Sequence, residues 1–134
     1  MCDWFTFHVD QGAKMITIEM NMQVLLETQP ETYAEADEFC TDTLLPVIDQ
    51  LRDTCNTHGY SQICIVDLKD VDVLLLSPSI LTRLLWNIWE HTKDNPENLI
   101  QSFNVTNSNA IFRGIYRASK KILPTYLTNL ITIS

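Results

Sequence analysis

The sequence predicts a single α/β domain with a mostly parallel sheet and crossover helices, in the order β-β-α-β-α-β-α-β. Short β-branched runs alternate with longer segments whose apolar residues recur every three or four positions, and strands that alternate with helices form parallel sheets. The chain has 134 residues, 46% of them hydrophobic, with 3 glycines and 5 prolines. That composition suits one domain, residues 1–134, with a substantial core.

The first two strands are expected to form a hairpin. The runs WFTFHV (4–9) and KMITIEMNMQVLL (14–26) are rich in strand-forming residues, and the turn DQGA separates them. The polar segment LETQPE (26–31) contains a proline and is expected to be a loop.

The first helix is expected to begin at Thr32, because Thr32 and Glu35 have the spacing of a capping box. Its apolar residues share one helical face: Ala36, Cys40, Leu44, Val47, Leu51 and Cys55. Pro46 is expected to kink this helix because it lacks a backbone N–H. Gly59 is expected to end it in a left-handed conformation.

The second half of the chain repeats the alternation. ICIVDL (63–68) is apolar without alternation, which predicts a strand buried on both faces. Ser77-Pro78 predicts the start of a helix over residues 79–94. This helix is expected to point four apolar residues inward: Leu81, Leu84, Leu85 and Ile88. LIQSFNV (99–105) predicts a third core strand, and one of Asn107, Ser108 or Asn109 is expected to cap the next helix. PTYLTNLITIS (124–134) is expected to end the chain as a strand.

Charge and composition exclude several classes of protein. The net charge of −8 argues against nucleic acid as a partner. No apolar run is long enough for a membrane span, and the N-terminus has no basic region of the kind found in signal peptides. We therefore expect a cytoplasmic protein whose four cysteines are reduced and mostly buried. Residues 1–97 contain all 17 acidic residues and five basic ones, so their net charge is −12. The last 37 residues have a net charge of +4.

Catalytic and metal-binding patterns are absent from the sequence. It contains no glycine-rich phosphate loop, no nucleophile–base pair and no metal-ligand spacing of cysteine and histidine, so we expect no catalytic residue, no cofactor and no metal. Asp67 ends a predicted central strand and is expected to accept hydrogen bonds from loop N–H groups. The alternative, a hard cation held by Asp67, Asp70 and Asp72, lacks further oxygen ligands.

Two clusters are candidates for binding. Trp86 and Trp89 are three residues apart and share one side of a helix, either in the core or at a ligand pocket. Four basic residues form a stripe at positions i, i+4, i+7 and i+8: Arg113, Arg117, Lys120 and Lys121. This stripe is either solvated or in contact with anionic lipid headgroups or an acidic protein surface.

The stretch DNPENLIQSFNVTNS (94–108), together with its flanks, resembles the CRAL-TRIO lipid-binding domain. The matching positions are Asp67-Leu68 after a strand, Pro96-Glu97 with Leu99, and Lys120 with Leu123, and VDQGAKMITI is similar to the turn before the first core strand of that family. The resemblance covers residues of about 9–133. The sequence departs from the pattern at four places. Asn95 and Asn98 stand where the family has Tyr and Arg, Lys121 where it has Pro, and Thr106-Asn107-Ser108 where it has Asn-Ala-Pro.

This resemblance implies a non-enzymatic protein that binds a lipid or other apolar ligand, with peripheral membrane contact through the basic stripe. The ligand is expected to contact Trp86, Trp89, Phe103 and Phe112, which lie near the segments that form the pocket in that family. The resemblance also implies that the chain lacks the family's N-terminal helical subdomain and C-terminal gate region.

A second resemblance is to STAS domains. IVDLKDVDVLLLSPSILTRLL is similar to their central strand and following helix, with Ser77 and Ser79 near the helix start. It implies the alternative function, a ligand-free interaction or regulatory module that self-associates. We expect a homodimer in either case, because WFTF and LITIS offer strand edges and the two charged regions are complementary.

Overall fold

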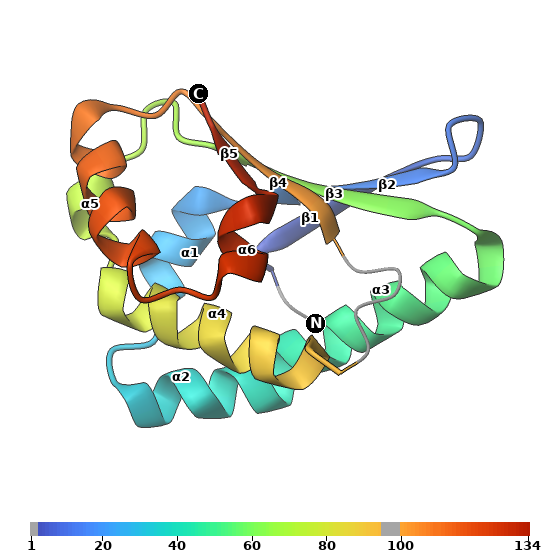
Figure 1. Cartoon of the computed structure of the whole chain (residues 1–134), viewed down its shortest axis with the longest axis horizontal. Helices are drawn as coiled ribbons and strands as arrows, with labels where there is room; N and C mark the ends of the chain where they lie inside the picture. Colours follow the sequence, from blue (N-terminus) through green and yellow to red (C-terminus); the bar gives the residue numbers. More distant parts are fainter. Residues whose placement is uncertain (1–2, 95–99) are drawn as a thin grey trace.

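The computed structural model of the chain describes residues 3–94 and 100–134 (Figure 1). In that part of the chain, five strands form one sheet in sequential order: β1 (Phe5–Asp10), β2 (Met15–Met20), β3 (Ser61–Asp67), β4 (Ile100–Thr106) and β5 (Ile131–Ile133). β1 and β2 are an antiparallel hairpin, and every later pairing is parallel. The predicted fold class, α/β with a mostly parallel sheet, is confirmed.

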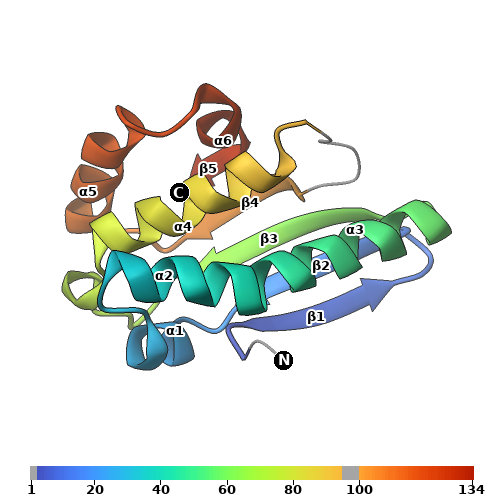
Figure 2. The ribbon, with the colours of Figure 1, turned by 90° about the horizontal axis from the view of Figure 1, so that it is seen from below.

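The helical elements connect the strands. They are α1 (Met22–Thr28), α2 (Tyr33–Phe39), the π-helical turn η1 (Cys40–Leu44), α3 (Leu45–His58), the 3₁₀ turn η2 (Val73–Leu75), α4 (Pro78–Thr92), α5 (Ala110–Lys120) and α6 (Thr125–Leu130). Right-handed crossovers between strands in sequential order return to the same side of the sheet each time. The helices α2, α3 and α4 accordingly lie together over one face of the sheet (Figure 2).

The prediction that the central strand is buried on both faces is wrong. Along β3, Gln62, Cys64 and Val66 are buried, whereas Ile63 and Ile65 between them are only half-buried. The alternation arises because the helices cover one face and leave the other without a helical layer. The sequence of β3 does not show this alternation in burial, because both faces of the strand carry apolar residues: valine, isoleucine and cysteine.

Two segments expected as strands contain helices. The ladder of β2 ends at Asn21, whose N–H donates to the Trp4 carbonyl, and α1 follows at once. Trp4 then donates from Nε1 to Thr28 Oγ1 at 2.8 Å, which holds the end of α1. Near the C-terminus, the Pro124 carbonyl accepts the N–H groups of Leu127 and Thr128 and begins α6. Most residues of α1 are good helix formers, and a distant contact with Trp4 holds its end, whereas α6 begins with local backbone bonds to Pro124.

The first long helix is continuous from Tyr33 to His58, but its middle is not α-helical. Thr32 caps it as predicted, since its hydroxyl accepts the Glu35 N–H at 3.1 Å. A π-helical turn lies just before Pro46, where the Leu45 N–H donates to the Cys40 carbonyl, and the kink at Pro46 stays a prediction. Gly59 ends the helix with φ of 68°, which confirms the predicted left-handed cap.

Candidate functional site

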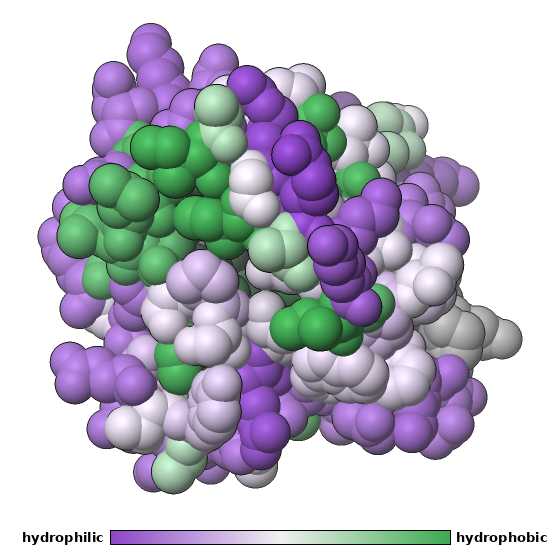
Figure 3. All heavy atoms as spheres, turned by 60° about the vertical axis from the view of Figure 1, so that its left-hand side comes forward, coloured by the Kyte–Doolittle hydropathy of each residue, from purple (hydrophilic) through white to green (hydrophobic). Residues whose placement is uncertain are grey.

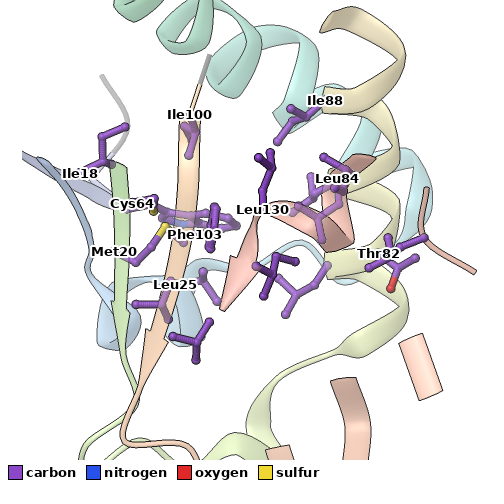
Figure 4. Close-up of a pocket in the computed structure, with 18 of the residues that line it drawn as sticks. Ile18, Met20, Leu25, Cys64, Thr82, Leu84, Ile88, Ile100, Phe103 and Leu130 are labelled. Carbon is purple, nitrogen blue, oxygen red and sulfur yellow. The ribbon is translucent and has the colours of Figure 1, made fainter. Parts of the chain in front are cut away.

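An apolar cavity of about 310 Å³ lies between the sheet and the helices. Figure 4 shows side chains from the strands on one side and from α4 on the other, which point toward a shared space. Ligand pockets in proteins are typically hollows of this kind, lined by apolar side chains with few polar groups. The cavity is therefore the candidate site.

The strands supply the floor of the cavity. Side chains alternate along a strand, and the register of the sheet aligns the floor residues of neighbouring strands. The floor residues are Ile18, Met20, Gln62, Cys64, Val66, Ile100, Phe103, Val105, Ile131 and Ile133. A strand pattern that buries one face thus produces a continuous apolar surface under the helices.

The helix α4 supplies one wall. Leu81, Leu84, Leu85 and Ile88 recur at the spacing of one helical face and all line the cavity, as their predicted inward orientation requires. The helix is held against α2 by Arg83, which donates two hydrogen bonds of 2.8 Å to the Asp37 carboxylate. Asn87 donates a third, at 2.7 Å. These bonds hold the pKa of Asp37 at about 2.

The opposite wall is formed by α5 and α6 and is less firmly packed. Phe112, Ile115, Tyr116 and Ser119 of α5 line the cavity, yet none of the residues of α5 is buried. Gly114 lies in the middle of this helix, and a Cβ built there would meet nothing within 4 Å. Neither close packing nor a left-handed backbone explains a glycine at this position.

The chemistry of the lining is uncharged. Among the described residues that line the cavity, none is Asp, Glu, Lys, Arg or His. The Cys64 thiol faces the cavity from β3, and burial raises its pKa to about 12. Burial also raises the pKa of Tyr116. Both groups therefore stay protonated at neutral pH, so the cavity contains neither a Cys64 thiolate nor a Tyr116 phenolate.

The four aromatic residues expected at the ligand occupy two different places. Phe103 and Phe112 line the cavity, from β4 and α5. Trp86 and Trp89 lie on α4 but outside the lining, with their rings edge to face at 5.2 Å. Trp86 donates from Nε1 to the Ile122 carbonyl at 3.1 Å, which links α4 to the segment after α5. A contact between any of the four and a ligand stays a prediction.

Trp4 was not among the residues predicted at the site. This side chain is buried, lines the cavity and packs against Phe39 at 4.7 Å between ring centroids. Its position at the start of a predicted strand gave no sign that it would reach the helical layer. A bond from Nε1 to Thr28 across 24 residues holds it there.

The four basic residues of the stripe are exposed on or directly after α5. Arg113 also donates to the carbonyl and the hydroxyl of Ser108, at 3.0 and 3.1 Å, and so holds the turn that precedes the helix.

Three apolar side chains are exposed on η2 and at the start of α5: Leu74, Leu75 and Ile111. We call them the apolar patch. In Figure 3 hydrophobic residues gather on the face where η2 and α5 meet, beside hydrophilic ones.

Asp67 has the structural role predicted for it. Its Oδ1 accepts the Lys69 N–H at 2.9 Å and the Asn107 side-chain amide at 2.8 Å. These two hydrogen bonds lower the pKa of Asp67, and the bond from Asn107 has the larger effect.

In residues 3–94 and 100–134, no group of three or more His, Cys, Asp or Glu side chains is placed to hold a metal ion. The Pro96-Glu97 motif lies outside the described residues.

Comparisons with known proteins identify the fold and no more. No family model matches the chain, and no curated protein matches it either. A solved structure does match: the crystal structure of Sfh5 aligns with 98% of this chain at a TM-score of 0.66 and 15% sequence identity. The alignment covers 46% of the Sfh5 chain, so this chain spans less than half of that protein. At this identity the match shows a shared α/β fold.

Proposed function

We propose that this domain binds a lipid or another apolar ligand in the cavity between sheet and helices, without catalysing a reaction. The observation that carries the proposal is a hollow of about 310 Å³ whose described lining is uncharged. The protonated state of Cys64 and Tyr116 at neutral pH supports a binding role over a catalytic one. The CRAL-TRIO family, which the sequence resembles, binds lipids, and the fold agrees with that resemblance.

The binding proposal is tested by filling the cavity. Leu130 of α6 points into it (Figure 4), and Leu130→Phe places a larger side chain there. Ile122→Phe is the matched control, because Ile122 is 60% exposed and does not line the cavity. Native mass spectrometry of freshly purified protein should show a bound apolar molecule in the wild type and in the control, and a reduced fraction in Leu130→Phe. Equal occupancy in all three would place the ligand elsewhere, and a ligand-free wild type that takes up none of several lipid classes would remove the proposal.

The ligand reaches the domain, in our proposal, from an anionic membrane surface that the basic stripe and the apolar patch contact. Leu74 and Leu75 are 68% and 60% exposed, and the Asp72 carboxylate and the Gln29 side chain fix their backbone. Each basic residue near an anionic bilayer contributes roughly 1 kcal/mol, screened by salt. Asp70 and Asp72 are close to the patch in sequence and oppose part of this attraction.

Charge reversal tests the membrane contact. Arg117→Glu with Lys121→Glu is preferable to a change at Arg113, which also holds Ser108. The control is Lys14→Glu in the β1–β2 turn, at the end of the molecule opposite to α5 (Figures 1 and 2). Sedimentation with vesicles of phosphatidylserine and phosphatidylcholine at low salt should show binding by wild type and control, lost in the double variant. Binding that the double variant retains would show that the stripe is only solvated.

Within the described part of the chain, every helix is too short or too polar to cross a membrane.

One observation favours the alternative function, a self-associating interaction module. β1 is an edge of the sheet, and Phe7 and Val9 on it are exposed although they point to the face that carries the core. Such an edge can pair with a strand of another chain.

A further inference from the structure

The size of the cavity limits what it can hold. A water molecule takes up about 30 Å³ in the liquid, and a methylene group is of similar size. A volume of about 310 Å³ therefore holds roughly ten methylene-sized groups. One medium-length chain fills it, and the two chains of a membrane phospholipid exceed it.

The lining also limits the charge of the ligand. An ionised headgroup inside the cavity would find no cation among the described lining residues, and an unpaired buried charge is strongly disfavoured. The four basic residues of the stripe do not line the cavity, so they cannot compensate such a charge. The chemistry inside the cavity therefore suits a neutral molecule.

A few hydroxyl groups on the helical side can still recognise a polar head. Thr82 of α4 and Tyr116 and Ser119 of α5 line the cavity, and none of the three hydroxyls has a hydrogen-bond partner in residues 3–94 and 100–134. The hydrogen bond between Trp86 and Ile122 joins α4 to the segment after α5. Thr82 lies about one helical turn before Trp86, and Ser119 lies about one helical turn before Ile122. Gln62, on the floor, already has a partner. The helical wall thus offers neutral donors and acceptors at one side of an apolar space.

We infer that the cavity takes one single-chain, uncharged amphiphile of about ten carbons, such as a medium-chain alcohol or monoacylglycerol, with its hydroxyl head against Thr82, Tyr116 and Ser119. The two chains of a diacyl phospholipid do not fit inside this volume together, and the uncharged lining disfavours a carboxylate or phosphate head within the cavity. This inference rests on the proposed function and narrows the class of ligand.

The first test compares matched probes on a variant that reports on the cavity. Trp89→Phe keeps the Trp86–Ile122 bond and leaves two tryptophans, of which Trp4 lines the cavity. The tryptophan fluorescence of this variant is titrated with decanol, decanoate and didecanoyl phosphatidylcholine, which differ in charge and in chain number but share the chain length. Native mass spectrometry gives the stoichiometry. We expect one decanol per chain, with decanoate and the phospholipid at least tenfold weaker.

The second test measures the length of the cavity. Each methylene buried should lower the dissociation constant about fourfold. Octanol, decanol, dodecanol and tetradecanol should therefore show a steep fall in the dissociation constant up to decanol or dodecanol. Beyond that length the constant should stay level, because further carbons remain outside. A steady fall through tetradecanol would overturn the single-chain limit.

The third test concerns the hydroxyl groups. Tyr116→Phe with Ser119→Ala should weaken decanol about two- to tenfold, the contribution of one hydrogen bond, and leave the affinity for decane unchanged. Equal losses for both probes would show that the variant disturbs packing and would overturn the assignment of the head position.

The outcomes distinguish a failure of this inference from a failure of the proposed function. If the phospholipid or decanoate binds as tightly as decanol, the inference is wrong and the cavity still binds lipid. If neither decane nor any of the amphiphiles changes the tryptophan fluorescence or appears in the mass spectrum, both the inference and the proposed function are wrong.

Discussion

Truncating Leu84 to alanine should both destabilise the domain and lengthen its preferred ligand. Leu84 is 4% exposed and lines the cavity from α4. The substitution removes three carbon groups, each worth about 0.8 kcal/mol of burial, so the transfer contribution is about 2.4 kcal/mol. It also adds roughly 90 Å³ of empty space if a carbon group is taken as water-sized. At about 24 cal/mol per Å³ of residual cavity, that space costs up to about 2 kcal/mol more.

We therefore expect Leu84→Ala to lower the free energy of unfolding by about 2.5–4.5 kcal/mol, a large share of the roughly 5–15 kcal/mol typical of a domain. Urea denaturation followed by circular dichroism measures it as a lower midpoint at unchanged slope. Leu74→Ala is the matched control, because Leu74 is 68% exposed. Its effect should stay within about 0.5 kcal/mol.

The same variant should move the plateau of the alcohol series by about three carbons, since the removed side chain vacates space for three. A loss of stability below about 1 kcal/mol, or equal to that of Leu74→Ala, would refute the assignment of Leu84 to a packed cavity wall. A clear loss of stability with an unmoved plateau would refute the link between cavity volume and ligand length.

Three further predictions concern other parts of the molecule. The pKa of Asp37 is held at about 2, so its stabilising effect is present above the unfolded value of about 3.9 and is lost as the pH falls toward 2. Asp37→Asn should flatten that part of a stability–pH curve, and a curve like that of the Asp53→Asn control would count against the Arg83 contact. Gly114→Ala should raise stability by up to about 1 kcal/mol in thermal unfolding, because the site is open and helical. Gly59→Ala should lower stability instead, because φ is 68° there, and the same sign for both would contradict the assignment. Finally, light scattering after size exclusion should report a homodimer that Phe7→Lys disrupts, whereas a 15.4 kDa particle at every concentration would leave a monomer.

Much of the fold follows from periodicity in the sequence. The capping box at Thr32, the left-handed Gly59 and the alternation of strands and helices are local signals, and the structure agrees with each. The two helices that were missed, α1 and α6, are short and directly adjoin a strand. Most residues of α1 are helix formers, and the contact between Trp4 and Thr28 that holds its end spans 24 residues, which sequence spacing does not reveal. The residues of α6 have mixed propensity.

The candidate site was only partly predictable for a similar reason. Helical spacing correctly directed Leu81, Leu84, Leu85 and Ile88 inward. It could not distinguish the side of α4 that faces the cavity from the neighbouring side that carries Trp86 and Trp89. Trp4 reaches the cavity through a contact over 24 residues, which no local pattern shows. The cavity itself is a gap between layers, and a sequence describes side chains but not the space that they leave.

The sequential strand order also affects how the chain folds. Each strand of the sheet pairs with the one synthesised just before it, so the sheet can grow in the order in which the ribosome releases it. Only the β1–β2 hairpin closes a short loop, which favours rapid pairing, whereas each parallel pair must close a longer crossover that contains helices. The wall formed by α5 and α6, with β5 beside it, emerges after β1 to β4 and α4. The nascent chain therefore exposes the apolar surface that α5 and α6 cover until that wall is added, so a ligand can contact the floor before its second wall is in place.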